Sequence, residues 1–142
     1  MRDQFHNILA QVLIANATYS ADTTPVAIDL QGFQAATIEI SIGAGGITFT
    51  GTNKVEFVLE HSDDNSSWAQ CATSDVMGAT IASGGIIKAL TAAHATADVS
   101  LIGYKGGKRY LRLTADFSGT HATGTPIGAN LILGDPALRP TQ

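Results

Sequence analysis

The side chains that could support chemistry are four histidines and a single cysteine. The histidines are His6, His61, His94 and His121, and none of them stands at a metal-binding spacing such as His-x-His or has a cysteine close by in the sequence. They are therefore expected to be solvated or to lie at an interface. His61 follows an alternating strand on its apolar side, so it is expected to be half-buried and is the one to inspect for pH sensitivity. Cys71 is expected to be a small buried hydrophobe.

The acidic run Asp63-Asp64-Asn65 raises the question of a calcium site. Calcium requires about six to eight oxygen ligands, and the calcium-loop pattern with its distant glutamate is missing, so the run is expected to be a plain turn. The sequence also lacks a nucleophile elbow, a phosphate loop and a dinucleotide fingerprint. We therefore expect no enzyme, no catalytic residue, no cofactor and no metal site.

Four of the eight positive charges fall close together, at Lys105, Lys108, Arg109 and Arg112. Two interpretations are open: the solvent face of a strand, or a patch that docks onto an acidic neighbour such as another protein shell. Tyrosine, tryptophan and arginine are enriched where interfaces concentrate their energy. The candidate interaction residues are accordingly Trp68, Lys105, Lys108, Arg109, Tyr110 and Arg112.

Strand patterns surround these residues. Between Lys54 and Glu60 apolar and polar residues alternate, Ser62–Ser67 is expected to be a tight polar turn, and Trp68 begins a return strand. The segment 108–117 alternates in the same way, with Leu111, Leu113, Ala115 and Phe117 facing inward. The pair at 106–107, two glycines, is expected to form the hairpin turn before it.

The whole chain has turn signals roughly every 8–12 residues and about eight to ten short strands, a pattern typical of sandwiches and barrels. The sequence predicts one all-β domain over residues 1–142, an antiparallel β-sandwich that is jelly-roll-like. An N-terminal arm is expected at about 1–10. An extended tail is expected at about 135–142, where two prolines block regular structure. Residues 90–95 have marginal helical propensity.

Charge is unusually scarce: 44% of the residues are hydrophobic and 14% are charged, against about 25% charged in ordinary domains. Such a chain is expected to hide much of its surface against copies of itself or a partner. The net charge of −4 disfavours nucleic-acid binding. No apolar run approaches the roughly 20 residues of a membrane helix, so no membrane-spanning segment is expected. The polar residues Asp3 and Gln11 interrupt the pattern of a signal peptide, so export is not expected.

Three segments together carry a family resemblance. VEFVLEHSDDNSSW at 55–68, IGYKGGKRYLRLTADFSG at 102–119 and ANLILGDPALRP at 129–140 resemble, in this order, a small protein encoded among the head genes of tailed bacteriophages. The resemblance covers most of the chain and is weakest over 71–97. It implies a structural virion protein that decorates or cements the capsid or builds a head spike. Its partners would be the major capsid protein or neighbouring head proteins. It would be made in the bacterial host cytoplasm and located on the capsid exterior.

Two functions follow as expectations. The first is the capsid-associated structural protein, assembled as a homo-oligomer. Symmetric shells offer threefold and fivefold positions, so a closed ring is expected, and fold-level analogy favours a trimer. The second is a carbohydrate-binding β-sandwich module of a phage tail fibre or spike. In that case sugars would stack on exposed aromatic rings, for which the candidates are Trp68, Tyr104 and Tyr110.

Overall fold

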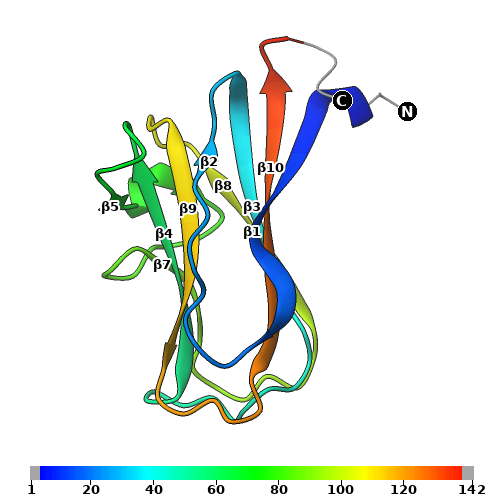
Figure 1. The fold of residues 1–142 in the computed structure, drawn as a ribbon, viewed down its shortest axis with the longest axis vertical. Helices are drawn as coiled ribbons and strands as arrows, with labels where there is room; N and C mark the ends of the chain where they lie inside the picture. The colour runs from blue at the N-terminus through cyan, green and yellow to red at the C-terminus, as the bar shows by residue number, and fades with distance from the viewer. Residues whose placement is uncertain (1–3, 139–142) are drawn as a thin grey trace.

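A computed structural model of the chain describes residues 4–138. Two five-stranded antiparallel sheets stack face to face (Figure 1). The elements are, in chain order, η1 (Phe5–Asn7), β1 (Ile8–Tyr19), β2 (Ile28–Asp29), β3 (Phe33–Ile42), β4 (Lys54–Ser62), β5 (Ala69–Gln70), η2 (Thr73–Asp75), β6 (Val76–Met77), β7 (Ile86–Leu90), β8 (Asp98–Tyr104), β9 (Tyr110–Ser118) and β10 (Thr125–Pro136), where η denotes a short 3-10 helix.

The strand order confirms the predicted jelly roll. Sheet A has the order β1-β10-β3-β8-β6, and sheet B has the order β2-β9-β4, with β5 and β7 both pairing with the far edge of β4. Along the chain β1, β3, β8 and β10 fall in one sheet, and β2, β4, β7 and β9 fall in the other. This alternation between facing sheets is the double Greek key of a jelly roll.

Alternating hydrophobicity places the core between the sheets. Ile38 and Ile40 of β3 are 0% exposed, as are Leu111 and Leu113 of β9. These residues occupy every second position, so each strand buries one side and leaves the other outside. The predicted inward faces are thereby confirmed, except that Phe117 at the end of β9 is only half-buried.

The edge of sheet B is completed by side chains instead of a full strand. The sequence pattern of residues 26–30 predicts a short strand, and only the two residues of β2 form one. Upstream of it, Thr23 Oγ1 accepts a hydrogen bond from the buried Ala115 N–H at 2.9 Å, and Asp22 Oδ1 accepts one from the Phe117 N–H at 2.7 Å. Two side chains thus satisfy donors of β9 that a neighbouring strand would otherwise satisfy.

Three local expectations were wrong. The glycines at 106–107 do not turn a hairpin, because β8 pairs with β3 and β6 in sheet A while β9 belongs to sheet B. Residues 90–95 form no helix, since β7 ends at Leu90 and a loop follows. The sequence pattern of residues 47–49 predicts a brief strand, yet these residues are irregular, although Phe49 is buried in the core. In each case tertiary packing overrides a weak local signal.

The ends are more ordered than the arm and tail the sequence suggested. β10 continues through Pro136, which lies opposite Phe33, and the Ala137 N–H donates to the Gly32 carbonyl. Residues 8–10 belong to β1, after the single turn of η1. The described chain begins and ends at the same end of the sandwich (Figure 1). The rest of the expected arm and tail, 1–3 and 139–142, lies outside the described residues.

Candidate functional site

The outer face of sheet B is charged. Arg112 of β9 lies directly opposite Glu60 of β4, and its Nε donates to Glu60 Oε2 at 2.8 Å. Lys54 forms an ion pair with Glu56 two residues along the same strand, at 2.7 Å. A cross-strand pair of opposite charges contributes modestly to sheet stability while it keeps the surface hydrated. This face resembles an ordinary water-facing surface.

Two of the aromatic rings that were candidates for sugar stacking already have an arginine side chain packed over one face. The Arg112 guanidinium lies 4.2 Å from the centre of the half-buried Trp68 ring, and Arg109 lies 5.0 Å from the centre of the Tyr110 ring. The third candidate, Tyr104, is buried at 7% exposure. One face of each accessible ring is therefore occupied from within the chain.

The predicted basic cluster is divided between two places. Lys105, Lys108 and Arg109 line a groove of about 700 Å³ together with the β2–β3 turn and the start of β3. Tyr110 and Arg112 lie on sheet B outside that groove. Lys108 pairs with Asp63, and Arg109 pairs with Asp29 at 2.7 Å. Within residues 4–138 Lys105 is the member of the cluster without an ion pair, so most of its charge is already balanced.

Two carboxylates in this region have shifted pKa values. The hydrogen bond from Arg109 lowers the pKa of Asp29 below its usual value. The pKa of Asp64 is held well below its usual value because its carboxylate accepts backbone N–H bonds from Ser67 and Ser66. Asn65, which follows Asp64, adopts the left-handed conformation with φ of 58°. The run Asp63-Asp64-Asn65 is thus a capped turn, as expected.

The outer face of sheet A is nearly free of charge. Its strand pairing places Val12, Asn130, Glu39 and Leu101 in one row across four strands. Besides Asp98 of β8, which pairs with Lys88 of sheet B, and the exposed Asp135 near the end of β10, the charged strand residue described for this sheet is Glu39. It accepts a hydrogen bond from Asn130 Nδ2 at 3.0 Å. The two faces of the sandwich therefore differ sharply in polarity.

Large apolar side chains are exposed on that same face. The exposed fractions are 37% for Ile8, 54% for Val12, 56% for Met77, 58% for Val99 and 61% for Leu101. The edge strand β1 continues this character, because its twelve residues include no charged side chain and nothing in the described chain pairs with its outer edge. Charges and prolines normally protect such edges from pairing with another chain.

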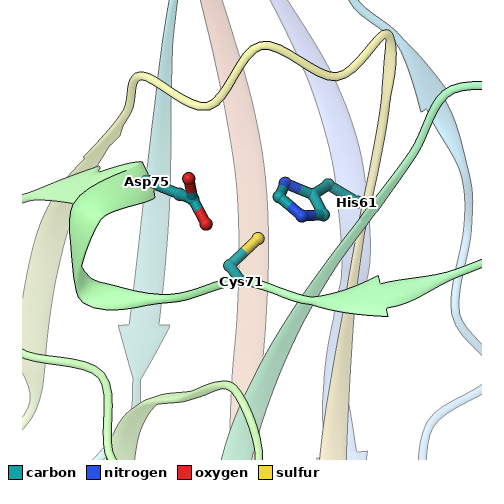
Figure 2. Close-up of side chains that lie close together, drawn as sticks. All are labelled: His61, Cys71 and Asp75. Atoms are coloured by element: carbon teal, nitrogen blue, oxygen red, sulfur yellow. The ribbon is translucent and has the colours of Figure 1, made fainter.

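A separate polar cluster is buried at the end of β4. One nitrogen of His61, the sulfur of Cys71 and a carboxylate oxygen of Asp75 all lie within 4.8 Å of one another. In Figure 2 the three side chains turn toward a common space, Cys71 from the segment after β5 and Asp75 from η2. His61 Nδ1 is also 3.0 Å from the buried Tyr104 hydroxyl.

Burial raises the pKa values of the Cys71 thiol and of the neighbouring Tyr104 hydroxyl. Cys71 is 3% exposed, which confirms its expected burial, and His61 at 9% exposed is more deeply buried than the half-buried position expected for it. Burial, with smaller contributions from Asp75 and Glu60, raises the pKa of the Cys71 thiol to about 12. Burial likewise raises the pKa of Tyr104 to about 12. Both groups are therefore protonated near neutral pH, and Cys71 by itself is unreactive.

The sequence reasoning missed this cluster because it looked for ligands at short spacings. His61, Cys71 and Asp75 are separated by nine and three residues, and pairing between β4 and β5 brings them together. A partial signal existed, since Cys71 was expected to be buried and His61 was expected to lie half-buried on the apolar side of its strand. His121 also differs from expectation: it is 4% exposed and packs against Phe117 at 4.9 Å between ring centres.

Comparison with known proteins finds solved structures of similar fold. No protein-family model matches the chain, and no curated protein matches it by sequence. The fold is similar to that of the SPBc2 prophage-derived protein YomS, with a TM-score of 0.51 and 10% identity over 91% of this chain and 94% of that one. At this identity the likeness establishes a shared fold. In the described part of the chain no helix has the length and apolar character needed to cross a membrane.

Proposed function

We propose that this chain is a structural virion protein of a tailed bacteriophage, which decorates or cements the capsid as a homo-oligomer. The observation that carries the proposal is the contrast between the two outer faces. Sheet B presents ion pairs to solvent, whereas the outer face of sheet A presents Val12, Val99 and Leu101 around Glu39. An exposed apolar face of this kind marks an interaction surface.

The partner proposed for sheet A is a second copy of the same chain. A charge content of 14% over the whole sequence limits how much apolar surface one copy can keep dispersed in water. The long, uncharged edge of β1 adjoins the face, so one interface could join side-chain packing to strand pairing. A closed ring is the usual solution for identical copies, and we propose a trimer.

The phage setting rests on two independent supports. The sequence resembles small phage head proteins over three ordered segments, and the fold is shared with a protein derived from a prophage. The same proposal includes contact with the major capsid protein and location on the capsid exterior. It also includes a role in that contact for the groove residues Lys105, Lys108 and Arg109. The carbohydrate-binding alternative has less support, since Tyr104 is buried and arginines cover one face of Trp68 and Tyr110.

Binding to phage heads tests the proposal. Heads of the encoding phage assembled without this chain are mixed with the purified protein and sedimented. The wild type should sediment with the heads in a saturable, symmetry-related copy number, and the matched control Thr114→Lys on sheet B should do the same. Failure of the folded wild type to bind heads, or its absence from purified virions, would overturn the capsid function.

A further inference from the structure

We propose that His61, Cys71 and Asp75 bind a thiophilic divalent metal ion of the zinc type. Their donor atoms are an imidazole nitrogen, a sulfur and a carboxylate oxygen, all within 4.8 Å of one another. This is a mixed donor set that zinc accepts in four-coordinate sites, with the fourth position open to water. In such sites the donors stand about 3.3–3.6 Å apart, so inward movements on the order of 1 Å would complete the geometry.

The surroundings already orient the donors. The Tyr104 hydroxyl at 3.0 Å engages His61 Nδ1, which leaves Nε2 as the nitrogen for the metal. Hydrogen bonding of the second ring nitrogen is the usual way proteins orient a metal-binding histidine. The Cys71 N–H donates to the Leu59 carbonyl, and Asp75 Oδ2 accepts from the Ala72 N–H at 2.8 Å. One N–H bond uses only part of the acceptor capacity of the Asp75 carboxylate, so the carboxylate can also bind the ion.

Electrostatics also favours a cation here. Asp75 is half-buried and has no ion-pair partner among residues 4–138. Buried carboxylates are normally paired or coordinate a metal, because an uncompensated charge is costly to desolvate. Binding breaks the S–H bond of Cys71, forms a metal–sulfur bond and releases one proton to water, with no change of oxidation state. The bound ion would tie the end of β4 to the segment that leads into β6 of sheet A.

Cobalt(II) provides a specific probe, because Cys71 is the only cysteine in the chain. Added to the metal-free full-length protein, Co²⁺ should produce a thiolate-to-cobalt charge-transfer band that saturates at one ion per chain. Excess Zn²⁺ should abolish this band and should raise the melting temperature. Absence of both the band and the melting shift in the wild type would overturn the proposal without any variant.

Variants then identify the ligands. His61→Asn and Asp75→Asn should each lose the band or weaken Co²⁺ binding at least about 10-fold, and Tyr104→Phe should weaken binding by roughly 10–100-fold through the lost orientation of His61. His94→Gln is the matched control and should bind like the wild type. Circular dichroism establishes that each variant is folded. A band that persists unchanged in folded His61→Asn and Asp75→Asn would overturn this ligand set.

Discussion

At the residue scale, Asp64 illustrates how a turn becomes a source of pH dependence. Its carboxylate accepts hydrogen bonds from the backbone N–H groups of Ser66 and Ser67 and from the Ser62 hydroxyl. These bonds favour the ionised form, so the pKa of Asp64 in the folded chain lies below its unfolded value of 3.8. The turn that defines the β4–β5 hairpin is thus stabilised by charge.

The sign of the resulting pH effect follows from linkage. As pH falls, the unfolded chain takes up the proton first, so stability from Asp64 is present above pH 3.8 and is lost as pH drops toward its folded pKa. Asp29 and Asp98, whose pKa values are also lowered, act in the same direction.

We therefore expect the urea midpoint of the wild type to fall between about pH 5 and about pH 3. Asp64→Asn keeps an acceptor oxygen but removes the titration, so its midpoint should start lower and fall less steeply. Fluorescence of Trp68, the single tryptophan, follows both transitions. Identical slopes for the two proteins would show that Asp64 does not contribute this pH dependence.

Trp68 and Arg112 show the limits of reading single residues from sequence. Both were selected as interaction residues, and the structure places them in contact with each other, 4.2 Å from guanidinium carbon to ring centre. Arg112 also binds Glu60 across the strand pair. Composition can indicate that arginine and tryptophan favour interfaces, but not whether their partner is in the same chain.

At the element scale, the edge of sheet B depends on Thr23. This residue is 7% exposed, and its hydroxyl satisfies the N–H of Ala115, which is 0% exposed. The isosteric change Thr23→Val removes the acceptor and leaves a buried donor without a partner. It should lower the free energy of unfolding by about 1–3 kcal/mol.

Urea denaturation measures this loss, and the exposed neighbour Thr24→Val is the matched control. The control should change stability little, since surface substitutions of this kind usually lie within about 0.5 kcal/mol of zero. Equal stability of Thr23→Val and the wild type would mean that the Ala115 N–H finds another partner at no cost.

The elements also show what sequence periodicity can determine. Alternation identified the buried faces of β4 and β9, because burying one side of a strand imposes a period of two. It could not assign β8 and β9 to different sheets, because a glycine pair fixes a local turn and carries no information on long-range pairing. The continuation of β10 through Pro136 escaped prediction for the same reason.

For the candidate sites too, local patterns predicted some features, whereas contacts between distant segments determined the others. The burial of His61 and Cys71 followed from the alternation of β4 and from composition, but their meeting with Asp75 depends on the β4–β5 register and on η2. The basic cluster was recognised from its spacing along the chain, whereas its neutralising partners Asp29, Asp63 and Glu60 come from other strands and turns. Contacts between distant segments are the part that local patterns do not encode.

At the scale of the whole molecule, the two outer faces suit different surroundings. Sheet B, with its cross-strand ion pairs, suits exposure to water, and sheet A, with its exposed valines and leucine, suits contact with another surface. A stiff two-sheet body with one apolar face fits a component of a symmetric assembly better than a monomer.

The most direct test is the solution mass by light scattering over a range of concentrations. The wild type and the sheet B control Thr114→Lys should give three times the chain mass of 14.7 kDa. Leu101→Lys should shift the mass toward a single chain; Glu39 stands opposite position 101 and can pair with the new lysine, so the sheet should stay folded. A wild type of 14.7 kDa at every concentration, or a Leu101→Lys mass equal to an oligomeric wild type, would contradict self-association through sheet A.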